Sequence, residues 1–111
     1  MAIKLVDSNV PLVCCGKPMT ELKPNTEEMA SEKHLPVVTR LDNGRIKVEV
    51  GSIPHPMTPE HNIAFIYVET DNGGIRVDLR DSPEAVVSVG DSRVVAVYEY
   101  CNIHGLWRVE M

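Results

Sequence analysis

The chain has 111 residues, of which 43% are apolar and 24% are charged. This length is enough for one domain with a single core, and the composition is that of a soluble globular protein. The net charge of −5 comes with basic residues scattered along the sequence, which argues against a nucleic-acid partner. No apolar run approaches the roughly 18 to 20 residues that cross a bilayer, so we expect no membrane insertion.

The first 31 residues are polar and carry turn signals around Pro18 and Pro24. We predict that they form an arm laid over the rest of the fold, and that residues 32–111 form the folded domain. The start of the chain lacks the charged, apolar and small-residue succession of a secretory signal, so we expect a cytoplasmic protein. The odd number of cysteines, three, also fits a reducing compartment.

Beyond the arm, the dominant period of the sequence is two. Polar and apolar residues alternate in 45–50 and 75–80, which predicts two strands with one buried face each. The Asp, Asn and Gly residues of 42–44 and 71–74 tolerate positive φ and predict hairpin turns. Residues 63–70 and 93–101 are apolar on both faces, as is typical of central strands or of strands at a subunit contact.

Further strands are expected at residues 84–89 and 106–111, and no segment has the pattern of an amphipathic helix. About seven short strands separated by turns predict an all-β fold, an antiparallel β-sandwich. Pro54, Pro56 and Pro59 forbid both helix and sheet pairing between residues 52 and 60, so this segment is expected to be a rigid loop.

All four histidines lie within two residues of a proline or a glycine, and His104 also lies three residues after a cysteine. A single histidine in a β-protein is usually a surface or hydrogen-bonded residue, and Cys101-x-x-His104 alone is a weak metal signal. The proline-clamped loop changes this balance, because a preorganised backbone lowers the entropy cost of assembling a site. The candidate ligands are four imidazoles and one thiolate: His34, His55, His61, His104 and Cys101.

The number and type of these donors constrain the metal. Structural zinc sites close with four ligands and favour several thiolates, whereas magnesium and calcium prefer oxygen ligands. Five nitrogen and sulfur donors suit a square-pyramidal centre with an open sixth position. The residues alone therefore predict a redox-capable or Lewis-acidic non-haem metal site.

Three segments, residues 32–37, 51–61 and 101–107, resemble the superoxide reductases, also called neelaredoxins and desulfoferrodoxins, and the similarity covers residues 12–111. The resemblance implies an immunoglobulin-like sandwich of the one-iron type, with equatorial histidines and an axial Cys101. It further implies reduction of superoxide to hydrogen peroxide, with rubredoxin or a similar protein as electron donor, in a homo-oligomer such as a tetramer.

The same resemblance assigns roles to the two residues before His34. Glu32 would be the sixth ligand in the oxidised state, and Lys33 would face the open position in the ferrous state. An ammonium group beside that position would attract an anionic substrate. Without the adjacent ligand, a solvated Glu-Lys pair would be the ordinary interpretation.

Residues 13–19 resemble the second half of a four-cysteine iron site found in larger family members. The first half, a Cys-x-x-Cys, is absent, and two thiolates cannot close a tetrahedral site within one chain. We therefore interpret Cys14 and Cys15 as a remnant without metal. A vicinal disulfide and a site shared between subunits are the alternatives.

Two other functions are compatible with these residues. An iron electron carrier would use the same ligands without reacting with superoxide, and a zinc-stabilised binding module would be colourless. Fold analogy alone does not separate these classes from an enzyme, whereas the five-donor set favours the superoxide reductase.

Overall fold

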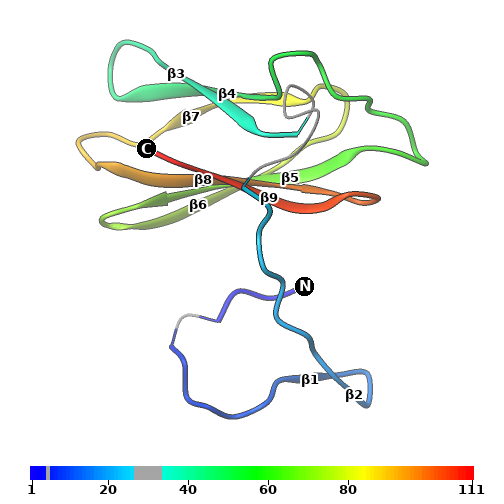
Figure 1. Ribbon diagram of the computed structural model, residues 1–111. Helices are drawn as coiled ribbons and strands as arrows, with labels where there is room; N and C mark the ends of the chain where they lie inside the picture. The colour runs from blue at the N-terminus through cyan, green and yellow to red at the C-terminus, as the bar shows by residue number, and fades with distance from the viewer. Residues whose placement is uncertain (5, 27–33) are drawn as a thin grey trace.

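The computed structural model describes residues 1–4, 6–26 and 34–111, and all of its regular secondary structure is β (Figure 1). Seven strands form two facing antiparallel sheets, which confirms the predicted all-β sandwich. One sheet has the order β3-β4-β7 and the other β6-β5-β8-β9. The bounds are β3 Pro36–Arg40, β4 Arg45–Val50, β5 Ile63–Thr70, β6 Gly73–Asp78, β7 Glu84–Ser88, β8 Val94–Cys101 and β9 Gly105–Glu110. Within the described ranges there is no helix with the length and apolarity that crossing a membrane requires.

Three hairpins, β3–β4, β5–β6 and β8–β9, build most of the two sheets. The chain changes sheet after β4, after β6 and after β7, so strands that follow each other in sequence face each other across the core. This exchange between two antiparallel sheets is the immunoglobulin-like arrangement.

Both predicted hairpin turns are present. Arg40 pairs with Ile46 around the first turn, where Asn43 and Gly44 have φ of 61° and 69°. A Cβ atom on Gly44 would lie 2.7 Å from the carbonyl oxygen of Gly90, so this position requires glycine. In the second turn, Thr70 pairs directly with Gly73.

Strand β6 therefore begins two residues before the predicted 75–80 segment. The second turn is shorter than its composition suggested, because Gly73 and Gly74 already belong to the ladder. The ring of Tyr67 occupies the space where a Cβ atom on Gly74 would lie. The absence of a side chain on Gly74 thus allows the Tyr67 ring to pack against this strand.

The core lies between the sheets and confirms the alternation predicted for residues 45–50. Every second residue of β4 is buried, and β5 and β8 are the central strands of the larger sheet. Burial of one such aliphatic side chain contributes about 1.5–3 kcal/mol to folding. The buried cluster comprises Ile46, Val48, Val50, Ile63, Ile66, Val68, Val87, Val94, Val97 and Cys101.

The outer face of the larger sheet carries aromatic rings. Phe65 stacks on Tyr100 with ring centroids 5.9 Å apart, and the guanidinium groups of Arg76 and Arg108 lie over the rings of Phe65 and Tyr98. These cations cover part of the aromatic surface. This explains how strands that are apolar on both faces are accommodated within a single chain.

The prediction that the arm lies over the sandwich is wrong. Its two short strands, β1 Val13–Cys14 and β2 Lys17–Pro18, form a separate hairpin that stands away from the sheets (Figure 1), and the described residues up to 18 are all exposed.

The arm meets the sandwich at Asn25, whose backbone N–H donates to the Leu106 carbonyl and whose carbonyl accepts from the Arg108 N–H, at 2.8 and 2.9 Å. It joins there because β9 is an edge strand with open backbone groups, while the outer face of this sheet is already occupied by rings and guanidinium groups. The predicted boundary after residue 31 lies outside the described residues and stays a prediction.

Candidate metal centre

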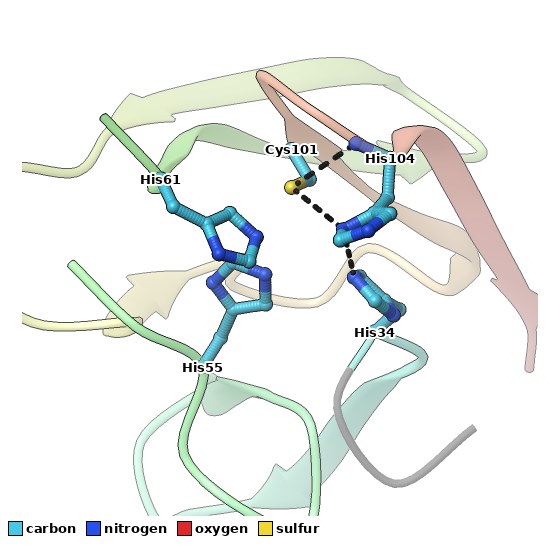
Figure 2. Close-up of side chains that lie close together, drawn as sticks. All are labelled: His34, His55, His61, Cys101 and His104. Atoms are coloured by element: carbon cyan, nitrogen blue, oxygen red, sulfur yellow. Dashed lines mark hydrogen bonds between the residues drawn. The ribbon is translucent and has the colours of Figure 1, made fainter. Parts of the chain in front are cut away.

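Five side chains from three segments of the sequence converge at one end of the sandwich (Figure 2). Each offers one ligand atom, and all of these atoms lie within 4.8 Å of one another. The structure therefore brings together every candidate ligand that the sequence predicted within the described residues. We refer to these five residues as the central cluster: His34, His55, His61, Cys101 and His104.

Sheet register explains the convergence. Pro36 pairs with Val50, so His34, two residues before β3, and the loop just after β4 emerge side by side. Ile63 pairs with Cys101, so His61, two residues before β5, lies near the last residue of β8. The β8–β9 turn, closed by the pair Cys101–Gly105, carries His104. Backbone pairing within each sheet, together with the packing of the two sheets, thus brings residues up to 70 positions apart into contact.

The four imidazole rings form a closed square. Neighbouring centroids are 5.1 Å apart for His34–His55, 4.6 Å for His55–His61, 5.1 Å for His61–His104 and 4.7 Å for His104–His34. Interplanar angles of 63° to 81° set each ring edge-on to the next. Figure 2 shows the rings pointing toward a common centre. Four nitrogens can therefore lie around a single ion.

Hydrogen bonding identifies the nitrogen that each ring offers. Nε2 of His34 lies 3.0 Å from Nδ1 of His104, while Nε2 of His55 and Nε2 of His61 are buried without a hydrogen-bond partner among the described residues. Metal–nitrogen bonds of about 2.1 Å at right angles separate adjacent nitrogens by roughly 3.0 Å. The observed spacing and the buried nitrogens therefore fit a metal ion that accepts three Nε2 atoms and one Nδ1 atom.

His55 is held in the form that binds a metal. Its Nδ1–H donates to the Pro56 carbonyl at 2.8 Å, which leaves the lone pair on Nε2. Burial lowers the pKa of His55; the Pro56 hydrogen bond opposes this, and the neighbouring His61, His34 and His104 add to the lowering. The neutral imidazole is favoured, and a fixed tautomer aims its free nitrogen into the square.

Cys101 supplies the sulfur from the core side of the cluster. It is fully buried, and its Sγ accepts the backbone N–H of His104 at 3.4 Å and lies 3.6 Å from His104 Nδ1. A backbone N–H aimed at sulfur stabilises a thiolate. The Cys-x-x-His spacing thus serves two purposes, because the same turn supplies a ligand and a hydrogen bond to the other ligand.

Trp107 supports two members of the cluster, and its role was missed by sequence reasoning. Its ring stacks on His34 with centroids 4.8 Å apart and an interplanar angle of 14°. Its Nε1–H donates to the His104 carbonyl at 3.1 Å. The available signal was the single tryptophan of the chain, six residues after Cys101.

Asn102 ties the two ligand-bearing loops together. Its Oδ1 accepts the backbone N–H of Asn62 at 2.9 Å, and its Nδ2 donates to the Glu60 carbonyl at 2.9 Å. The backbone N–H of His61 donates to Thr58 Oγ1 at 3.1 Å within the same loop. These contacts fix the residues on both sides of His61, which confirms that the 52–60 segment is an ordered loop outside the sheets.

The cluster is shielded on one side and open on the other. His34, His55 and Cys101 are buried, His61 is partly buried and His104 is exposed. Glu32 and Lys33, predicted as the sixth ligand and a substrate-attracting charge, lie outside the described residues. Four imidazoles and one thiolate suit a redox-active transition metal such as iron, and thiolate ligation increases electron density at the metal.

The fold and this site define a β-sandwich metalloprotein with mixed imidazole and thiolate ligands. The chain belongs to the desulfoferrodoxin family, because the family model described as Desulfoferrodoxin matches residues 26–110. This confirms the family predicted from the three sequence segments.

Relatives carry both family names. The chain is 45% identical to the desulfoferrodoxin of Nitratidesulfovibrio vulgaris over 89% of this chain and 79% of the relative. It is 37% identical to the superoxide reductase of Pyrococcus horikoshii, over 72% of this chain and 86% of the relative. The predicted class of enzyme is thus the class to which its named relatives belong.

Similar solved structures also include superoxide reductases. The superoxide reductase of Treponema pallidum superposes with a TM-score of 0.83 at 34% identity, covering 96% of this chain and 90% of that one. The superoxide reductase (neelaredoxin) of Archaeoglobus fulgidus in its reduced form gives a TM-score of 0.57 at 30% identity, covering 79% of this chain and 95% of that one. The first match extends into the arm, whereas the second leaves about a fifth of this chain uncovered.

Proposed function

We propose that this protein is a superoxide reductase that uses one iron held by the central cluster. The reaction is one-electron reduction, in which superoxide, one electron and two protons give hydrogen peroxide. The observation that supports it best is the closed square of four imidazoles with a buried thiolate beside it. Family membership supports the same assignment.

The ligands in this proposal are Nε2 of three histidines, Nδ1 of the fourth and the sulfur of Cys101. When bound, iron would supply the single electron by cycling between its ferrous and ferric states. The buried thiolate raises the electron density that favours this transfer, and the His104 N–H at 3.4 Å from Sγ moderates it. The chain thus sets the reactivity of the site through one sulfur and one backbone hydrogen bond.

The exposed side of the cluster would receive superoxide. His104 is exposed while three of the other ligands are buried, so the small anion can approach without displacement of the core. The Nδ1–H bond of His55 to Pro56 keeps that ring oriented, and burial lowers its pKa, which favours the neutral form. The rigid ligand set then needs little rearrangement during electron transfer.

We further propose roles for Glu32 and Lys33, which directly precede His34. Lys33 would attract superoxide through its charge, and Glu32 would bind the oxidised iron as a sixth ligand. Both assignments are supported by the position of these residues next to a ligand in the sequence and by the resemblance of residues 32–37 to the family.

The partners are proposed from the same resemblance. Rubredoxin or a similar small redox protein would return the electron, and the protein would work as a homo-oligomer, with a tetramer as the form expected of one-iron members. Three free cysteines support a reducing compartment such as the cytoplasm.

The test is rapid mixing of the ferrous protein with superoxide. We expect one iron per chain, a blue ferric-thiolate colour after oxidation, and second-order oxidation with formation of one peroxide per electron. Iron that is oxidised by other acceptors but not by superoxide would indicate an electron carrier. A colourless protein that contains zinc after expression in iron-replete cells would indicate a binding module.

A further inference from the structure

A second pair of thiols lies outside the central cluster, in the arm hairpin formed by residues 12–19. Sγ of Cys14 lies 3.4 Å from Sγ of Cys15, and both residues are exposed and free. In a tetrahedral site with metal–sulfur bonds of about 2.3 Å, two sulfurs lie roughly 3.8 Å apart. The pair is therefore spaced close to one edge of such a site.

This spacing requires an unusual backbone. Successive side chains of an extended strand point to opposite faces, so adjacent thiols in β1 would diverge. Cys15 instead has a φ of 56°, followed by Gly16 at 77°, a left-handed pair typical of two-residue hairpin turns. A non-glycine residue there costs roughly 1–2 kcal/mol, and Asn or Gly would fit the turn better. The turn holds both sulfurs together at a position where cysteine is not the favoured residue.

The pair is only half of a metal site. Within residues 1–4, 6–26 and 34–111, the central cluster is the sole group of three or more histidine, cysteine or acidic side chains close enough to hold an ion. The only other cysteine of the chain, Cys101, is buried in that cluster, so two further thiolates must come from another molecule. We propose that two copies of this chain join their arm hairpins and share one thiophilic divalent cation, held by Cys14 and Cys15 of each copy.

Charge and exposure support a second copy as the partner. Four thiolates around a divalent cation carry a net charge of −2, and Lys17, paired with Cys14 across the hairpin, contributes one positive charge from each copy. Val10 and Val13 are 60% and 63% exposed, and Leu12 is 42% exposed. An isolated two-stranded hairpin is marginally stable, so a metal and an apolar contact would both stabilise it.

The experiment uses the full chain with iron in the central cluster, kept reduced and free of oxygen, and titrated with Co²⁺. We expect uptake of one Co²⁺ per two chains with the visible spectrum of tetrahedral thiolate coordination. Sedimentation should show an additional, metal-dependent association step, whose dissociation constant falls at least about 100-fold on metal binding, by mass action. The readout does not depend on superoxide chemistry, so its failure would leave the proposed function intact.

Cys14→Ser/Cys15→Ser should abolish both the Co²⁺ spectrum and the metal-dependent dimer while iron content stays at one per chain. Lys23→Ser, a matched change in the arm outside the hairpin, should retain both. The proposal is overturned by one Co²⁺ per chain, by Co²⁺-dependent association that persists in the double variant, or by no Co²⁺ uptake together with loss of two hydrogen masses per chain in air. The last result would identify a vicinal disulfide.

Discussion

The two cysteine-containing regions of this protein differ in how much of a metal site one chain supplies. Cys101 is buried and joined by four imidazoles, one from its own turn and three from other segments that the fold brings to it. Cys14 and Cys15 are exposed on a hairpin of their own. In the sandwich the site is complete, whereas in the arm it is half formed. The function of a thiol in this chain therefore depends on which elements the fold places beside it.

The first prediction removes ligands from the complete site. Cys101→Ser should abolish the thiolate-to-iron absorption and reduce iron content to well below half, because a hydroxyl is a poor substitute for a soft thiolate. His55→Ala should also lower iron content by leaving one corner of the square empty. Metal analysis and the oxidised visible spectrum measure both. An unchanged spectrum in Cys101→Ser would remove the sulfur from the ligand set.

The second prediction tests how Trp107 supports the ligands His34 and His104. Trp107→Ala should destabilise the fold by about 3–5 kcal/mol, as is usual for loss of a buried aromatic ring, and should speed release of iron. Trp107→Phe preserves a ring over His34 but removes the N–H bond to His104, which is worth about 1 kcal/mol. Thermal unfolding and iron loss to a chelator distinguish them. Equal iron loss in Phe and Ala variants would show that stacking does not position His34.

The third prediction concerns the substrate side of the central cluster. Lys33→Ala should slow oxidation of the ferrous protein by superoxide about tenfold at low salt, since local positive charge accelerates encounter with anions. The wild-type rate should fall as salt rises, and the variant should depend on salt less.

Lys47→Ala is the control for Lys33→Ala, because it removes the same charge from a strand where Lys47 pairs with Glu84. Its rate should stay near that of the wild type, and iron content should be unchanged in both. Equal superoxide rates for wild type and Lys33→Ala at low salt would exclude Lys33 from the mechanism.

The fourth prediction compares two asparagines. Asn102→Ala removes two hydrogen bonds that link the His61 loop to the Cys101 turn, at a cost of about 1 kcal/mol for each bond, and should increase the rate of iron release. Asn72→Ala removes a hydrogen bond to Ser92 in a different turn. It should lower the free energy of unfolding by no more than Asn102→Ala does, and it should leave the rate of iron release unchanged. If both variants release iron equally fast, the loop link has no special role at the site.

The weakest effect is expected from the arm. Deletion of residues 1–20 should shift the unfolding midpoint by less than about 2 °C, which corresponds to under roughly 0.5 kcal/mol for a domain of this size. The reason is that the contacts joining the arm to the sandwich begin at Asn25. Iron content should stay at one per chain. A large loss of stability or of iron would show that the arm contributes to the sandwich.

Local sequence patterns determined much of this protein. The period-two alternation of residues 45–50 and the central strands 63–70 and 93–101 were predicted with nearly their observed bounds, because strand patterning reflects neighbours along the chain. The Asp-Asn-Gly turns were predicted for the same reason, since positive φ is a property of single residues. The five metal-binding side chains were identifiable by donor type and by their motifs.

How those side chains meet depends on long-range packing. The cyclic order of the four rings and the choice of Nδ1 on His104 depend on loops that β-sheet register brings together from distant segments. The contact between the Cys14 and Cys15 sulfurs depends on one left-handed residue, and the arm joins the sandwich through backbone hydrogen bonds of Asn25 to the edge strand β9. Sequence patterns report which atoms are available, whereas distances between non-adjacent groups are set by the packing of the whole chain.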